Sequence, residues 1–99
     1  MKISDVRVRI ARNESDAKLR AYVDITLEDC FVIHGLKVIE GKNGKFVAMP
    51  SRKMPNGEYK DIAHPIFTDI RNEITNKVLE KYEEVAATVS ETEIFTHEE

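Results

Sequence analysis

Apolar and polar residues alternate in the N-terminal half of the chain, which is the period of a β-strand with one side in solvent. Residues 6–10 alternate valine or isoleucine with arginine, and residues 19–27 show the cleanest alternation in the chain. We therefore expect a strand in each of these segments. Residues 30–39 are apolar on both faces apart from a few positions, which predicts a central strand covered on each side.

Turn-forming residues separate these segments. Glu28-Asp29 puts two carboxylates in sequence, an arrangement that suits a turn better than a β-ladder. Asn43-Gly44 is a dipeptide that accepts the positive φ values of a tight type I′ turn. We expect hairpin connections at both places, with the second leading into a fourth strand.

Two prolines shape the next part of the chain. Pro50 ends the fourth strand because proline has no amide hydrogen to donate. The run Pro-Asn-Gly at 55–57 predicts a turn before a fifth strand, so that residues 50–57 form an enlarged hairpin loop. Arg52 and Lys53 lie side by side at the tip of this predicted loop, which makes them the first candidates for a contact surface.

From Pro65 onward the apolar residues recur every three or four positions, as on one face of an amphipathic helix. The stripe consists of Phe67, Ile70, Ile74, Val78, Tyr82 and Val85. Thr68 or Asp69 is the expected N-cap. The sequence thus predicts an α+β fold, in which a five-stranded, mainly antiparallel meander sheet carries one C-terminal helix. We expect a single domain over residues 1–87 and an acidic tail over residues 88–99, either frayed or forming a short second helix.

The length of the chain limits its stability. A domain of 99 residues buries only roughly 60–65% of the surface of its unfolded chain, so association with a second copy would add stability. The N-terminus lacks the apolar core of a signal peptide, and no apolar run approaches the ~20 residues that cross a bilayer. We therefore expect a cytoplasmic protein without membrane contact. Cys30 is the single cysteine, which excludes an intramolecular disulfide framework and suggests a half-buried strand residue.

Charge is unevenly distributed along the chain. The formal net charge is −3, yet residues 1–79 carry a net +3 and residues 80–99 a net −6. The segment from Lys37 to Lys60 contains six basic residues and two acidic ones. Because phosphate attraction depends on the local field and decays over about 8 Å at physiological salt, the acidic total does not exclude nucleic-acid binding.

Catalytic and metal-binding signatures are absent from the sequence. The three histidines and the cysteine lack metal-ligand spacing, and the glycines near residue 44 lack the spacing of a P-loop. Ser51, Asp61 and His64 do not lie in a nucleophile-elbow pattern, and His64 is better explained as a hydrogen-bonding partner that fixes a turn. We therefore predict no enzyme, no cofactor, no metal and no small-molecule substrate.

Arg71 carries a positive charge in the first turn of the predicted helix, where the helix macrodipole disfavours it. Together with the helix N-terminus and the Arg52-Lys53 loop, Arg71 would form an anion-binding corner. The alternative is that Arg71 pairs with Glu73 or a loop carboxylate and that the lysines are only solvated. The residues alone leave these two interpretations about equal.

Three stretches of the sequence resemble the stage V sporulation protein G (SpoVG) family of septation proteins. They are residues 31–39 (FVIHGLKVI), residues 41–53 (GKNGKFVAMPSRK) and residues 55–66 (PNGEYKDIAHPI). The resemblance extends from about Ile3 to about Tyr82. It implies a small bacterial DNA-binding regulator, with RNA binding also known in the family, that forms homodimers and influences septation, sporulation, capsule and virulence genes.

The resemblance also implies a role for particular residues. The basic loop and the start of the helix contact nucleic acid in that family, and Arg52, Lys53 and Arg71 occupy the matching positions. The chain departs from the family pattern at Phe67 and Ile70, where small polar residues are usual, and at Glu73, where a lysine is common. These departures bear on sequence preference.

Two functions are therefore expected from the sequence. In the first, a homodimer presents two copies of the cationic surface to a DNA or RNA backbone. In the second, the chain is a protein-interaction module of the cell-division or septation machinery that adds a partner strand to an exposed sheet edge. Salt dependence separates the two, because a phosphate-dominated complex dissociates as salt is raised.

Overall fold

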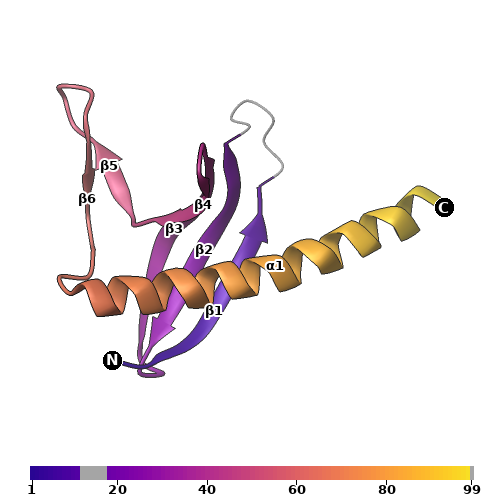
Figure 1. The fold of residues 1–99 in the computed structure, drawn as a ribbon, viewed down its shortest axis with the longest axis horizontal. Coiled ribbons are helices and arrows are strands. Elements are labelled where there is room, and N and C mark those ends of the chain that lie inside the picture. The colour runs from indigo at the N-terminus through magenta and orange to yellow at the C-terminus, as the bar shows by residue number, and fades with distance from the viewer. Residues whose placement is uncertain (12–17, 99) are drawn as a thin grey trace.

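The computed structural model describes the backbone of residues 1–11 and 18–98, and the side chains of the same segments as far as residue 88. It confirms the α+β class, with strands followed by one helix (Figure 1). The elements are β1 (Ile3–Ile10), β2 (Leu19–Leu27), β3 (Phe31–Gly41), β4 (Gly44–Ala48), β5 (Ser51–Lys53), β6 (Tyr59–Asp61) and α1 (Thr68–Glu98). The predicted segment 12–16, between the first two strands, lies outside the described residues.

The strands form two sheets, where the sequence predicted a single five-stranded meander. A four-stranded antiparallel sheet has the order β1-β2-β3-β4, and β5 and β6 form a separate two-stranded hairpin. The chain leaves the main sheet at Pro50, which is buried and cannot continue the ladder. The Ile62 amide donates to the Pro50 carbonyl over 2.7 Å, which closes the base of the hairpin.

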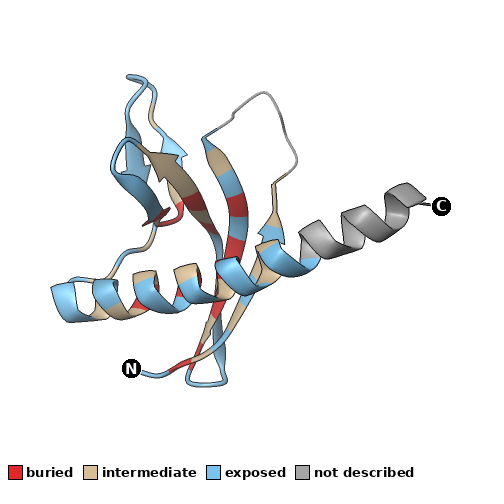
Figure 2. Cartoon of the chain, turned by 45° about the vertical axis from the view of Figure 1, so that its right-hand side comes forward, coloured by how far each residue is buried: buried red, intermediate tan, exposed pale blue. Residues whose placement is uncertain are grey.

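Helix α1 crosses one face of the main sheet, and the core lies between them (Figure 2). The alternating apolar residues of β2 from Ala21 to Leu27 face the helix and are buried, as the sequence predicted, whereas Leu19, before a register shift, is only half-buried. They meet one side of β3 and the middle of α1. The buried core residues are Ile3, Ala21, Val23, Ile25, Leu27, Leu36, Val38, Val47, Met49, Ile74, Val78 and Tyr82.

The apolar stripe of the helix is confirmed in the middle and corrected at its start. Ile74, Val78 and Tyr82 are buried, whereas Phe67 is 67% exposed. Phe67 precedes the helix, and its carbonyl accepts the first helical hydrogen bond, from the Arg71 amide. Phe67 therefore occupies the cap position that we expected for Thr68 or Asp69.

The other end of α1 includes most of the acidic segment. The helix continues to Glu98, so residues 88–98 extend α1 instead of forming a second helix. Helix α1 is long, but neither it nor any other helix within the described residues is both long and apolar enough to cross a membrane.

The connections agree with the sequence in position but not always in geometry. Glu28 and Asp29 form the expected turn, both with positive φ. The β3–β4 turn residues are Lys42 and Asn43, and only Gly44 has a positive φ, so the turn is not type I′.

Burial at the start of β3 also differs from the prediction. The strand is internal to the sheet, but Phe31 and Val32 are 62% and 48% exposed, so this end is not covered on each side. Cys30 is exposed in the turn before β3, where a half-buried strand residue was expected. The reason is that α1 crosses the sheet elsewhere and leaves this end of β3 open.

Candidate nucleic-acid interface

Arg52 and Lys53 lie in strand β5, directly before the loop tip at which the sequence predicted them. The tip comprises residues 54–58, where the Met54 amide donates to the Glu58 carbonyl over 2.7 Å and the Gly57 amide to the Met54 carbonyl over 2.9 Å. Gly57 has a φ of 90°, which accounts for a glycine at this point. These bonds close the tip tightly, so the residues before it pair as a strand.

The strand places the two cations on opposite faces of the hairpin. Arg52 pairs with Lys60, and Lys53 pairs with Tyr59. Because successive side chains of a strand point to opposite sides, Arg52 and Lys60 share one face and Lys53 and Tyr59 the other. The single cationic patch expected from adjacent residues is therefore split in two.

Arg71 lies in the first turn of α1 and is exposed. The main contacts of this helix are with β1, β3 and β4, while hairpin β5–β6 rises away from the start of α1 (Figure 1). The three predicted residues thus come from two separately packed elements. The anion-binding corner is not built by packing the helix on the hairpin.

Ion pairing divides the cations into two groups. Arg7 contacts Asp5 at 3.0 Å, and Lys45 lies 3.5 Å from Glu40 and 4.0 Å from Glu83. Within the described part of the chain, by contrast, seven exposed lysines and arginines have no carboxylate within ion-pair distance. Three of them are spread over the rest of the molecule, and four lie on the hairpin or at the start of α1. The four are Arg52, Lys53, Lys60 and Arg71. The pairing of Arg71 with Glu73 that we considered from the sequence is not formed.

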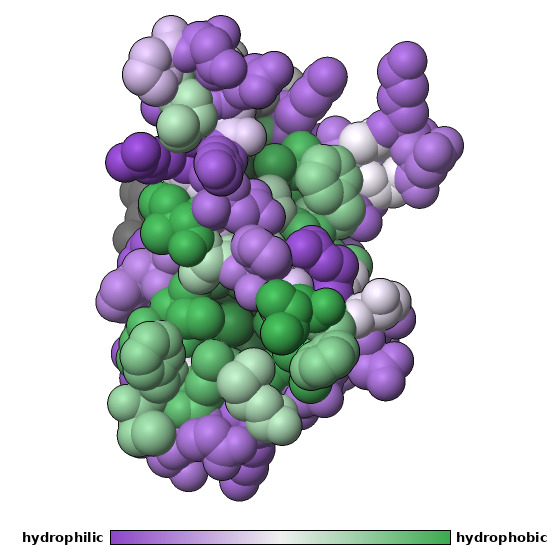
Figure 3. Space-filling view, turned by 90° about the vertical axis from the view of Figure 1, so that its left-hand side faces the viewer, coloured by the Kyte–Doolittle hydropathy of each residue, from purple (hydrophilic) through white to green (hydrophobic). Residues whose placement is uncertain are grey.

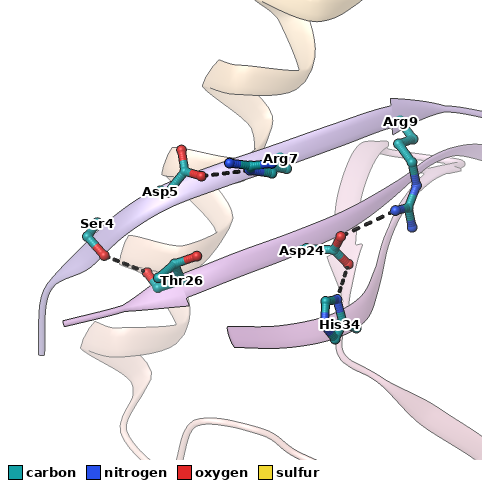
Figure 4. A network of polar contacts seen from close by, with 7 residues as sticks. All are labelled: Ser4, Asp5, Arg7, Arg9, Asp24, Thr26 and His34. Atoms are coloured by element: carbon teal, nitrogen blue, oxygen red, sulfur yellow. Dashed lines mark hydrogen bonds and ion pairs between the residues drawn. The ribbon is translucent and has the colours of Figure 1, made fainter. Parts of the chain in front are cut away.

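A polar network occupies the face of the main sheet that points away from α1 (Figure 4). Asp24 is its centre, with Arg9 Nη1 donating to Oδ2 at 3.3 Å and His34 Nδ1 at 3.0 Å from Oδ1. The His34 nitrogen is not aligned for a hydrogen bond, so Asp24 Oδ1 is shielded from solvent without a donor among the described residues. Asp5 lies on the same face with Arg7, so two carboxylates stand among the basic and aromatic side chains there.

Tyr59, Tyr22 and Phe46 were not identified as candidates from the sequence. Their side chains are 70%, 37% and 48% exposed, respectively. Tyr22 occupies one of the solvent-facing positions in the alternation of β2. That position was the available signal, since it leaves part of an aromatic ring exposed on the solvent face of the sheet.

The structure brings together two of the three residues that we weighed for catalysis, Ser51, Asp61 and His64. Ser51 and Asp61 pair across the hairpin, whereas His64 Nδ1 lies 3.1 Å from the Pro65 carbonyl oxygen. This contact agrees with the prediction that His64 fixes the turn before the helix.

Comparison with known proteins places the chain among relatives of the same size. The SpoVG family model matches residues 1–84. A protein named "Putative septation protein SpoVG" from Fusobacterium nucleatum is 56% identical over 82 residues, covering 83% of this chain and 88% of the relative. Its namesakes from Acholeplasma laidlawii and Acetivibrio thermocellus are 56% and 50% identical, covering 85% and 94% of this chain and 87% and 97% of the relatives. The chain belongs to the SpoVG family.

Proposed function

We propose that this protein is a cytoplasmic nucleic-acid-binding regulator that acts as a homodimer in bacterial septation and sporulation, without a catalytic step. The septation role follows the name of its relatives. The nucleic-acid role rests on one observation: the β5–β6 hairpin projects Arg52, Lys53 and Lys60 into solvent without carboxylate partners among the described residues.

Cations of this kind suit a phosphate backbone. A side chain already held by a carboxylate must give up that contact before it binds phosphate, and an unpaired one does not. Glu58 and Asp61 reduce the net charge of the hairpin, but Glu58 is engaged in the turn, where it lies 3.4 Å from Asn56 Nδ2. The hairpin therefore offers cations on both faces. A nucleic-acid strand that bends around the hairpin can contact the cations of both faces.

The dimer contact in this proposal is the apolar surface where α1 begins. Ile62, Ile66 and Phe67 are 67%, 81% and 67% exposed, and Met1 is 59% exposed. Met1 and the chain at residues 63–65 line one apolar hollow of about 110 Å³. Figure 3 shows apolar residues gathered on this side of the molecule, below the hydrophilic hairpin.

A second copy is the occupant that we assign to this surface. An exposed cluster of large apolar side chains on a domain with a small core is typical of a subunit interface. Arg71 lies four residues after Phe67, on the same side of the chain, and would stand at the rim of the contact. Two copies would present two hairpins, so binding at one would raise the effective concentration of nucleic acid at the other.

The test is a salt series of gel-shift or filter-binding measurements with DNA and RNA fragments. We expect affinity to fall with salt, and the variant Arg52→Glu/Lys53→Glu to bind more weakly with a flatter salt slope. The matched control is Lys77→Glu/Lys81→Glu, because these lysines line the groove between α1 and β1, away from the hairpin. Equal binding by the hairpin variant and the wild type would rule out the hairpin as the contact.

The alternative function is a protein-interaction module, and the open edge of the main sheet favours it. Strand β1 is the edge strand next to β2, and its other side pairs with no described strand. A partner strand could extend the sheet there. Recovery of a partner complex that persists at high salt, together with absent nucleic-acid binding, would support this function over the first.

A further inference from the structure

A cleft separates the hairpin from the face of the main sheet that α1 leaves open. Its volume is about 300 Å³, and one side is the sheet and the other is the hairpin. The lining residues are Leu19, Lys37, Ile39, Ala48, Ser51 and Tyr59. Leu19 pairs with Ile39 and Lys37 with Ala48, so these four form a continuous floor on one sheet face.

Aromatic rings surround this floor. Tyr59 forms the hairpin wall and is 70% exposed, which leaves most of its ring available. Tyr22 pairs with Lys37, and Phe46 pairs with Ile39. Directly paired residues lie on the same face, so both rings stand next to the cleft floor. Exposed aromatic rings along a groove are the surfaces on which unpaired bases stack.

Two cations accompany the rings. Lys37 belongs to the cleft floor, and Lys53 is paired with Tyr59 on the hairpin. Neither has a carboxylate within ion-pair distance in the described segments. Asp24, a carboxylate on the same sheet face as Lys37, is already bound by Arg9 at 3.3 Å. Asp61 shares the hairpin face of Lys53 and Tyr59 but forms no ion pair with Lys53. Flat apolar surfaces beside cations complement a strand that carries bases and phosphates together.

We infer that this cleft binds single-stranded nucleic acid, with one unpaired base stacked on Tyr59 and flanking phosphates on Lys37 and Lys53. The inference rests on the proposed function and specifies its ligand. A duplex keeps its base faces inside the stack, and therefore cannot offer one to the tyrosine ring. A single strand can, because its bases splay outward.

The rings of Tyr22 and Phe46 extend the same platform. Each lies one strand away from a floor residue, at a spacing of about 5 Å between neighbouring strands. A strand that enters the cleft at Tyr59 can therefore place a neighbouring base on either ring. The binding surface is distinct from the apolar surface at the start of α1 that we assign to the second copy.

The experiment compares an oligothymidine strand with a blunt duplex of the same length, each titrated by fluorescence anisotropy. The wild type should bind the single strand, and Tyr59→Ala should weaken that binding about tenfold or more while duplex affinity stays within about twofold. Tyr59→Phe keeps the ring and should retain wild-type affinity. Phe31→Ala is the matched control, because Phe31 is an exposed aromatic residue outside the cleft.

A second readout does not depend on affinity alone. Stacking of a base on Tyr59 should quench tyrosine fluorescence on addition of oligothymidine, and Tyr59→Phe should remove most of that quenching. If Tyr59→Ala binds oligothymidine as tightly as the wild type does, this inference is overturned. The proposed function still stands in that case, provided that the wild type binds duplex DNA or RNA. Failure of the wild type to bind any nucleic acid would overturn both.

The oligomeric state of the variants completes the test. Light scattering should give the same mass for Tyr59→Ala, Phe46→Ala and the wild type, since the cleft is assigned to nucleic acid. A lower mass for either variant would assign the cleft to a subunit contact and overturn the inference.

Discussion

Lys53 and Tyr59 are directly paired across hairpin β5–β6, so a cation and an exposed ring leave the same face of the hairpin. Arg52, the residue before Lys53, points to the other face with Lys60. This relationship distinguishes two adjacent basic residues that look equivalent in the sequence, and it leads to a direct test.

Lys53→Ala should weaken binding of oligothymidine more than Arg52→Ala does, because Lys53 lies beside the stacking ring. Loss of one phosphate contact should lower the slope of log affinity against log salt by about 0.7 for a single strand. Anisotropy titrations at several salt concentrations measure both effects. A larger loss from Arg52→Ala would place the strand on the opposite face of the hairpin.

Asp24→Asn should strengthen nucleic-acid binding to the open sheet face. The substitution removes a negative charge and releases Arg9, which Asp24 now holds. A unit charge about 10 Å from a phosphate in water contributes about 0.4 kcal/mol, so the affinity should rise about twofold. The gain should shrink as salt is raised, since the charge is screened over about 8 Å. A drop in affinity would show that Asp24 positions Arg9 for binding.

Phe67→Glu and Ile66→Glu should convert the proposed dimer to a monomer. Both side chains are more than half exposed in the single chain, so a glutamate costs little in the monomer but would be buried without a partner in the dimer. Light scattering after size exclusion measures the mass. Lys42→Glu, at the β3–β4 turn, introduces a similar charge elsewhere and should leave the dimer intact. A dimer that persists in both apolar-surface variants would place the interface elsewhere.

Leu36→Ala should destabilise the fold by about 2–5 kcal/mol, because Leu36 is fully buried on the helix-facing side of β3, where it pairs with Val23 of β2. Val32→Ala is the control in the same strand; Val32 is 48% exposed, and its truncation should cost far less. Urea unfolding of both variants measures the difference. Equal costs would mean that the open sheet face is covered in solution.

Gly57→Ala should loosen the hairpin tip through backbone strain alone. Gly57 has a φ of 90°, and an added Cβ would meet nothing within 4 Å. The cost should be about 1 kcal/mol or somewhat more, as for other residues forced to positive φ. Hydrogen exchange of the Met54 amide, which donates to the Glu58 carbonyl, should accelerate. Lys60→Ala in the neighbouring strand should leave that exchange rate nearly unchanged.

The sequence determined the elements with strong periodicity. The alternation over residues 19–27 predicted β2 with its bounds, and the three- to four-residue repeat of Ile74, Val78 and Tyr82 predicted the buried face of α1. Both patterns are local, because each residue's face follows from the residues next to it. The family could also be read from the contiguous stretches between residues 31 and 66.

Only the tertiary structure decided which side chains stand together. Arg52 and Lys53 are neighbours in sequence but lie on opposite faces, because pairing of β5 with β6 turned an expected loop into strands. Tyr59 lines one cleft with Lys37 and Ala48 because the chain leaves the main sheet at Pro50 and the hairpin stands beside the open face of the sheet. Such encounters depend on the path of the whole chain, which no short pattern of residues contains.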